Sequence, residues 1–332
     1  MQSPHDLLDK IKVTPLASES FGVRSMCTLL ETPDVSLLLD AGISLCPYRV
    51  NLPPHPVEFQ TINRLRQTIA DAADKCTITT ISHYHFDHHT PSFEDWVVNW
   101  TEKDETSHQI YQNKTVLAKN SKENINTSQR QRAWMFQRTS GKHAKNVTPA
   151  DGKTFAYGNT KVSFSKAVAH GSEGSTLGWV IMTTIEYDDE RFMHAPDVQG
   201  PMSTQTAELI LATKPAVIML GGPPFYLAGF RVEQTQLDDA LRNLMRIVEA
   251  VPLVILEHHA LRDENWKPKM EPVFQKAKLT RHCIVTAAEY TGQKNTFLEA
   301  KRKQLFHDYP PSEEFKQWMK TLNNKKIEKP PI

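Results

Sequence analysis

Short apolar runs separated by helical spacing predict an α/β fold in the first third of the chain. Residues 35–39 and 77–82 are apolar or β-branched runs with the length of buried strands. Between them, four prolines keep residues 43–57 irregular, and the apolar spacing of residues 58–73 predicts a helix. This helix leads directly into the second of the two strands.

The same alternation returns in the second half of the chain. Amphipathic stretches that begin at Thr204 and Glu233 predict helices, and apolar runs around them predict strands. The predicted strands are residues 161–165, 177–185, 216–220 and 253–257. Residues 301–332 are expected to form a charged C-terminal helix and tail, with helical spacing between Ser312 and Leu322.

A polar segment, residues 102–146, interrupts this pattern. It holds nine Lys or Arg against four Asp or Glu, around an apolar centre at residues 134–136. Long polar connections inside a compact domain tend to be lids or mobile segments. We therefore expect an insertion or cap within a single domain of residues 1–332. It either borders the functional site or is a solvated excursion without a role there.

Composition and charge limit the classes of function. The chain has 332 residues, of which 39% are hydrophobic and 23% charged, as in an ordinary globular protein. The formal net charge of +1 gives no strong field toward nucleic acid or membranes, so a local patch must hold any anionic ligand. The four cysteines form no Cys-x-x-Cys pair, which argues against disulfides and a cysteine zinc site. Because the sequence has no apolar leader or membrane-length apolar run, we expect a cytoplasmic protein.

Metal-ligand side chains crowd into residues 82–89, Ser-His-Tyr-His-Phe-Asp-His-His, directly after a predicted strand. Imidazole nitrogens and a carboxylate oxygen suit one or two first-row transition ions such as zinc. A His-rich surface loop is the alternative, but it does not explain the aromatic residues between the ligands. Thr90 and Pro91 then predict the N-cap and first residue of a helix that leads to Trp96 and Trp100.

Further ligands must come from other strand ends, because one loop cannot surround a metal ion. Three places combine a His or Asp with the end of an apolar run and a turn, and they hold His170, Asp197 and the pair His258 and His259. Each alone has a structural explanation, since a lone His is commonly a hydrogen-bonded core residue and an Asp before a turn commonly caps backbone donors. Their order along the chain makes them a candidate set.

The ordered set His-x-His-x-Asp-His, His, Asp and His, preceded by Leu39-Asp-Ala-Gly42, resembles the metallo-β-lactamase superfamily over most of the chain. The resemblance implies an α/β fold, a four-layer αββα sandwich with ligands on loops at one edge and an inserted polar segment. More narrowly, six segments resemble a family of archaeal proteins described only as predicted metal-dependent hydrolases, a match that implies no substrate. They are residues 19–25, 40–44, 53–56, 83–91, 197–201 and 221–224.

The resemblance also implies a role for each ligand. It assigns His83, His85 and His170 to one metal and Asp87, His88 and a late histidine to a second, with Asp197 bridging the two. Ribonuclease Z-like members place an arginine four residues after the late histidine, and Arg262 favours His258 over His259 on this ground. Asp40 is expected below the metals, where its carboxylate accepts an N–H from a ligand imidazole. The expected cofactors are two divalent ions, with zinc first and manganese or iron as alternatives.

Two such ions share a water, lower its pKa toward 7 and leave room for a carbonyl or phosphoryl oxygen, so a bridging hydroxide is the expected nucleophile. We therefore expect a dinuclear metal-dependent hydrolase that acts on an ester, phosphoester or related bond of a small molecule. The expected catalytic residues are Asp87, Asp197 and His259, with His259 ranked before His194 and Arg262 as the group that protonates the leaving group. The alternative for His259 is a packing or orienting role, and residues 221–224 form either a substrate-facing loop or a rigid turn.

Other functions remain open at this point. A nuclease or phosphodiesterase acting on RNA or DNA could use Arg130, Arg132 and Arg138 for phosphates and stack bases on Trp134 and Phe136, but the near-neutral net charge does not favour it. A redox enzyme with iron in the same ligands and a non-catalytic binding protein are the further alternatives. The sequence leaves the oligomeric state open.

Overall fold

The structure, a computed structural model, describes residues 7–322 and 328–332. Its first sheet has six strands in sequence order, antiparallel from β1 to β3 and parallel from β3 to β6. The strands are β1 (Lys12–Ser18), β2 (Met26–Glu31), β3 (Ser36–Leu39), β4 (Ile78–Ile81), β5 (Thr115–Ala118) and β6 (Asn146–Pro149).

The second sheet has seven strands in the order β15-β14-β13-β12-β11-β8-β7, and the pairs from β12 to β15 are parallel. A small ribbon of β9 (Val168–Ala169) and β10 (Trp179–Val180) lies beside it. The seven strands are β7 (Thr154–Tyr157), β8 (Thr160–Phe164), β11 (Thr183–Tyr187), β12 (Glu190–Ala195), β13 (Val217–Gly221), β14 (Leu253–Glu257) and β15 (Cys283–Val285).

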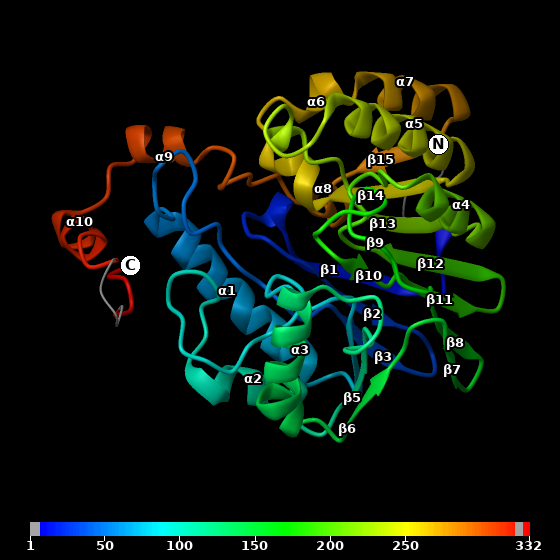
Figure 1. The fold of residues 1–332 in the computed structure, drawn as a ribbon, viewed down its shortest axis with the longest axis horizontal. Helices are drawn as coiled ribbons and strands as arrows, with labels where there is room; N and C mark the ends of the chain where they lie inside the picture. The colour runs from blue at the N-terminus through cyan, green and yellow to red at the C-terminus, as the bar shows by residue number, and fades with distance from the viewer. Residues whose placement is uncertain (1–6, 323–327) are drawn as a thin grey trace.

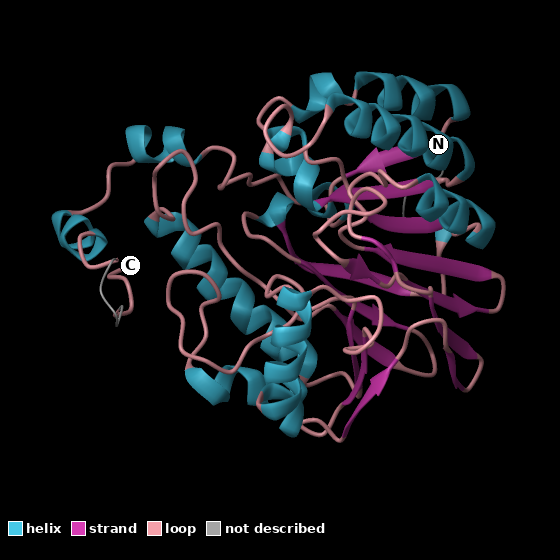
Figure 2. Cartoon of the chain, viewed as in Figure 1, coloured by secondary structure: helices cyan, strands magenta, loops and turns pink. Residues whose placement is uncertain are grey.

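Helices cover the outer faces of the two sheets, which lie against each other (Figure 1, Figure 2). The first sheet carries α1 (Pro56–Ala73), α2 (Lys103–Tyr111) and α3 (Thr127–Arg138). The second carries α4 (Thr204–Thr213), α5 (Gln234–Ala250), α6 (Trp266–Lys269) and α7 (Glu271–Thr280). The short α8 (Ala287–Tyr290) contacts β14 and also β1 and η2, and its buried residues belong to the core shared with the first sheet. Short 3₁₀ turns η2 (Glu19–Phe21), η3 (Ser140–Lys142), η4 (Phe225–Leu227) and η5 (His258–Arg262) lie in the connections.

Strand periodicity explains why four layers form. In β13, Val217 and Met219 belong to the core between the sheets, whereas Ile218 and Leu220 belong to the core under the second helical layer. Alternate side chains of a strand point to opposite faces, so a strand that is apolar throughout requires cover on both sides. The sheets touch directly, since Thr28 of β2 places its hydroxyl 3.1 Å from the sulfur of Met219. The expected αββα sandwich is confirmed.

The polar segment 102–146 is built into the first half of this sandwich. Its strand β5 is hydrogen-bonded between β4 and β6, and its helices α2 and α3 lie in the outer layer. Through α3 it also reaches the loop of predicted ligands, because the Arg132 guanidinium lies 3.4 Å from the carbonyl oxygen of Tyr84. The segment therefore supplies part of the sheet as well as a border of that loop.

The prediction of a helix after Thr90 and Pro91 is wrong. Residues 91–100 form bends and turns, because the Asp95 carboxylate accepts hydrogen bonds from the backbone N–H groups of residues 97–99 and replaces the helical pairing. The Thr90 hydroxyl, expected to cap a helix, donates to the carbonyl of Ala41 at 2.6 Å. This contact ties the ligand loop to the end of β3.

The C-terminal segment forms two short helices, α9 (Arg302–Asp308) and α10 (Glu313–Met319), as Figure 1 shows at the red end of the chain. The predicted helical region 312–322 contains α10, which starts at its N-cap Ser312. Phe315 and Trp318 are buried against Phe59 of α1, with ring centroids 6.0 and 5.5 Å from it. Within the described ranges, no helix has both the length and the apolar character needed to cross a bilayer.

Candidate metal centre

The ligand loop begins where β4 ends, and its base is fixed by Asp40 at the end of the neighbouring parallel strand β3. One Asp40 oxygen accepts a hydrogen bond from the Ser82 backbone at 2.8 Å, and the other lies 2.7 Å from Nδ1 of His88. Asp40 therefore has the position below the ligands that was expected. Gly42 allows the close approach, because a Cβ there would lie 2.2 Å from the backbone nitrogen of His89.

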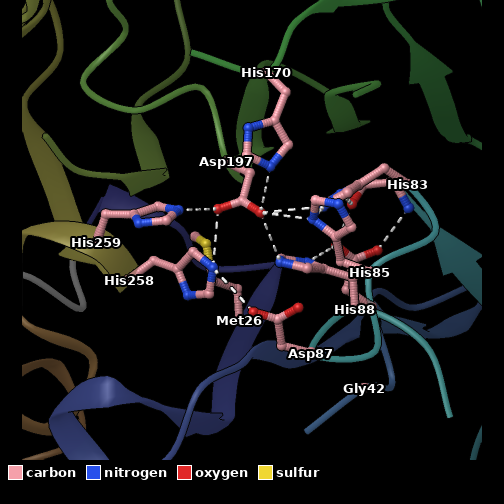
Figure 3. Close-up of polar contacts among 12 residues, drawn as sticks. Met26, Gly42, His83, His85, Asp87, His88, His170, Asp197, His258 and His259 are labelled. Carbon is pink, nitrogen blue, oxygen red and sulfur yellow. Dashed lines mark hydrogen bonds and ion pairs between the residues drawn. The ribbon is translucent and has the colours of Figure 1, made fainter. Parts of the chain in front are cut away.

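The site is centred on the carboxylate of Asp197, which follows β12 and is 2% exposed (Figure 3). Its Oδ2 atom lies 3.0 Å from Nε2 of His83, 3.1 Å from Nε2 of His170 and 3.3 Å from Nε2 of His88. The Nδ1 atom of His85 lies 3.9 Å from this oxygen and 2.9 Å from Nε2 of His83. The structure thus brings predicted ligands from three separate segments together.

The late histidines complete the cluster on the other side of Asp197. Nε2 of His258 and Nε2 of His259 lie 2.9 and 3.0 Å from the Oδ1 atom. His258 also lies 3.5 Å from Asp87, and with His88 these residues form one of the groups whose ligand atoms all lie within 4.8 Å. His83, His85, His170 and Asp197 form another such group, so Asp197 is placed between two potential metal positions.

The two late histidines have different neighbours at Nδ1. Nδ1 of His258 lies 3.0 Å from the Glu19 carboxylate, which can accept its N–H and leave Nε2 to face a metal. The Arg262 guanidinium also lies 3.2 Å from this nitrogen. Nδ1 of His259 faces the Tyr226 hydroxyl at 3.0 Å and the Arg262 guanidinium at 3.3 Å. Both histidines have a ligand atom in a group with Asp197 whose members lie within 4.8 Å of one another.

Electrostatics agree with a cation at this place. Burial, together with the neighbouring His88 and His85, holds the pKa of His83 well below its usual value, so His83 is a neutral donor. Burial alone would lower the pKa of His258 as well, but Asp197 and Glu19 outweigh it and raise this pKa to about 9. In the metal-free cluster a proton on His258 thus supplies positive charge that a bound cation would replace.

The residues fit one or two transition-metal ions by their chemistry. Nε2 of His88 and Oδ1 of Asp197 are buried polar atoms without a hydrogen-bond partner among the described residues, which is costly unless another group satisfies them. Nitrogen and carboxylate donors at these separations are what zinc and its neighbours bind. The backbone is left-handed at Asp40, Asp197 and His258, with φ of 48°, 51° and 66°, a conformation that concentrates at functional sites.

Other predicted residues lie elsewhere. His194 is buried with Nε2 3.0 Å from the carbonyl oxygen of Met26, so its N–H is used inside the protein. Phe136 is 2% exposed in the core, which corrects the expectation that it stacks bases. Trp134 is exposed and lies under the guanidinium of Arg138 at 4.5 Å, and the Gly221–Pro224 turn packs its first glycine against the backbone of Asp197.

The structure adds residues to which the sequence assigned no role. Glu19 in η2 accepts from Arg262 Nε at 2.8 Å and lies against His258, and both carboxylate and guanidinium are buried. Tyr226 in η4 contacts His259. Glu19 lies in a segment that carried the family resemblance, which was the available signal, whereas nothing marked Tyr226.

Comparison with known proteins gives close relatives of unassigned activity. No model of a known protein family matches the chain. The UPF0282 protein of Methanopyrus kandleri is 40% identical over 295 residues, covering 89% of this chain and 99% of the relative. The UPF0282 protein of Korarchaeum cryptofilum is 38% identical over 309 residues, covering 93% and 99%. The resemblance to an uncharacterised archaeal family is confirmed.

Solved structures give weaker similarity. The metallo-β-lactamase fold protein YhfI from Bacillus subtilis has a TM-score of 0.47 at 14% identity and covers 84% of this chain and 96% of its own. Tm1679, a metal-dependent hydrolase of the β-lactamase superfamily, has a TM-score of 0.44 at 10% identity and covers 84% and 97%. Both are what this chain is similar to, and scores at this level say nothing about activity.

Proposed function

The chain belongs to the UPF0282 family of archaeal proteins, and we propose that it is a metal-dependent hydrolase that holds two divalent ions around Asp197. His83, His85 and His170 would hold the first ion, Asp87, His88 and His258 the second, and Asp197 both. The nitrogen and oxygen donors suit zinc, with manganese and iron as the alternatives. When bound, such a pair supplies an activated water and a Lewis acid for cleavage of an ester, phosphoester or related bond.

One observation carries this proposal. Five imidazole nitrogens, from His83, His88, His170, His258 and His259, lie within 3.3 Å of the two oxygens of Asp197. A carboxylate that only stabilises the fold is satisfied by two or three donors, and mutually close imidazoles repel each other once protonated. Several imidazole nitrogens around one shared carboxylate are instead the arrangement that two cations would satisfy, with the cations in place of the protons.

The protein's own residues would divide the remaining work. Asp40 and Glu19 hold the rings of His88 and His258, so that the lone pair of each Nε2 faces the cluster. His259 presents Nε2 beside Asp197 with a side chain that is 10% exposed. Burial and the Arg262 guanidinium hold its pKa well below its usual value, so the neutral ring would stabilise the charge that develops on the leaving group through an N–H hydrogen bond. Asp87 and Asp197 would serve catalysis by holding the ions.

Metal analysis with a substrate panel tests this function. Purified protein should contain about two equivalents of metal, and reconstituted protein should cleave at least one generic ester, lactone or phosphoester. The variants Asp197→Ala and His83→Ala should lose metal and activity, whereas His307→Ala, which removes an exposed imidazole, should lose neither. Full metal content and full activity in both site variants would falsify the proposal.

A further inference from the structure

Arg132 is a partly buried cation beside the ligand loop. It lies on α3, with its guanidinium 5.0 Å from the centre of the Phe86 ring and 3.4 Å from the carbonyl oxygen of Tyr84. Among the described residues it forms no ion pair. Burial lowers its pKa, and Asp87 is the only carboxylate that acts against this effect. Asp87 is also a candidate metal ligand, so a bound cation would claim its charge.

Arg49 takes a similar position at the other end of the cluster. Its guanidinium lies 4.8 Å from the centre of the Tyr226 ring and donates to the carbonyl oxygen of Arg262 at 2.9 Å. Tyr226 in turn contacts His259, whose Nε2 faces Asp197. Within the part of the chain that the structure describes, no carboxylate pairs with Arg49. The side chain is partly exposed, so its outer donors remain available to a ligand.

The two arginines therefore flank the metal centre. Figure 3 shows His85, from the loop that Arg132 contacts, and His259, which adjoins Tyr226 and Arg49, on opposite sides of Asp197. A partly desolvated guanidinium without a counter-ion is unfavourable, and the cations expected between these two would add to the repulsion. An anion bound at the metal centre would relieve this.

We infer, on the basis of the metal-dependent hydrolase proposed above, that Arg49 and Arg132 form an anion clamp and that the substrate is an organic phosphate ester. Guanidinium groups match the oxygens of a phosphate in a planar, two-point geometry. A phosphate also carries the negative charge that both arginines and a metal centre attract, which a neutral ester or lactone does not. The formal net charge of only +1 means that such an anion depends on local groups of this kind.

Binding of inorganic phosphate tests the clamp without relying on turnover. Calorimetric titration of metal-free and metal-loaded protein should show phosphate binding, weakened about tenfold or more in Arg49→Gln and in Arg132→Gln. Arg132→Lys should fall between, since it keeps the charge without the planar fork. Arg64→Gln, which removes an exposed arginine of α1, is the matched control and should bind as the wild type does.

Turnover of paired substrates then separates specificity from general damage. With p-nitrophenyl phosphate, bis(p-nitrophenyl) phosphate and the uncharged p-nitrophenyl acetate, both Gln variants should lose kcat/KM for the phosphates and keep it for the acetate. Wild type that binds no phosphate, variants that bind it equally well, or equal losses for charged and uncharged substrates would overturn the clamp. If the protein binds no metal and turns over no substrate, but the two Gln variants still bind phosphate more weakly, the proposed hydrolase is refuted and the anion clamp is not.

Discussion

Nδ1 of His258 lies 3.0 Å from Oε2 of Glu19, although the two residues are 239 positions apart in the chain. Glu19 is held in turn by Arg262, whose Nε donates to its second oxygen at 2.8 Å. The pair of contacts fixes both the tautomer and the direction of the His258 ring. Carboxylates placed behind a ligand histidine commonly raise its basicity and orient it toward the metal.

Removing the charge of Glu19 should weaken the second metal position. We expect Glu19→Gln to lower the affinity for the second ion by about 10–100-fold. The neutral amide forms no ion pair with Arg262 and is a weaker acceptor for the N–H of His258, so the His258 ring is held less firmly. Titration of the metal-free protein with zinc, monitored by calorimetry, measures both binding steps. The first step, at His83, His85 and His170, should change little.

Glu31→Gln is a suitable control for this variant, because Glu31 is a carboxylate at the end of β2, away from the cluster. Unfolding by urea should be recorded for both variants, since Glu19 is buried and its loss also affects stability. Unchanged affinity for both ions in a folded Glu19→Gln protein would show that the contact with His258 serves the fold only.

His258 and His259 should respond differently to substitution despite being neighbours. His258→Ala removes a predicted ligand and should lower the metal content together with activity. His259→Ala should leave the metal content intact and lower kcat by about 10²–10³-fold, the range for the loss of one hydrogen-bond donor to developing charge. His259→Gln, which offers an N–H near the position of Nε2, should recover part of this loss. Metal analysis and steady-state kinetics distinguish the two, and loss of metal from the His259 variants would identify His259 as a ligand.

The convergence of the candidate ligands was predictable because each follows an apolar strand, and strand ends of the two packed sheets meet at one edge of the sandwich. His83, Asp197 and His258 follow β4, β12 and β14 in this way. Glu19 was not predictable, because in sequence a buried glutamate looks like a surface one. Its burial depends on η2 packing against η5, a contact between segments that lie far apart in the sequence.

Competition between the Asp95 side chain and backbone carbonyls for the same N–H groups explains why the helix predicted after Pro91 does not form. Residues after Pro91 have acceptable helical spacing, but Asp95 offers its carboxylate to three consecutive N–H groups and closes a turn instead. In the polar segment 102–146, by contrast, the sequence carries too weak a signal for helices that do form. Helices of the outer layer bury only a narrow apolar face, so most of their residues are polar. Phe136 supplies part of that face, which is why it is buried rather than available to a ligand.

Acid should destabilise the protein partly through Glu299. Burial alone would raise the pKa of this carboxyl, but the ion pair with Arg24, at 2.6 Å, holds it well below its usual value. In the unfolded chain Glu299 should titrate near a pKa of about 4.3. Its contribution is therefore complete above that pH and is lost progressively as the pH falls below it, because the unfolded state then binds the proton first.

Urea unfolding of metal-free protein between pH 3 and 6 measures this linkage, with the pH range set by the unfolded pKa of about 4.3. Other carboxylates titrate in the same range, so the comparison with Glu299→Gln isolates the term. The free energy of unfolding should fall less steeply with decreasing pH in the variant, by up to one proton in the slope. Parallel curves for the two proteins would contradict the shifted pKa.

The C-terminal segment should be attached to the domain mainly through Arg302. This side chain from the start of α9 is fully buried and makes two bonds to Glu58 of α1, at 2.8 and 2.7 Å. Arg302→Met would leave the Glu58 carboxylate buried without its counter-ion, which typically costs about 3–5 kcal/mol. Lys303→Met, which replaces an exposed neighbour, should cost little stability.

Adding Glu58→Gln to Arg302→Met should restore part of the stability, because the buried charge without a partner is then removed. Urea unfolding of the wild type, Arg302→Met, Lys303→Met, Glu58→Gln and the double variant tests this. Additive losses in the double variant would show that the two side chains stabilise the fold independently rather than as a pair.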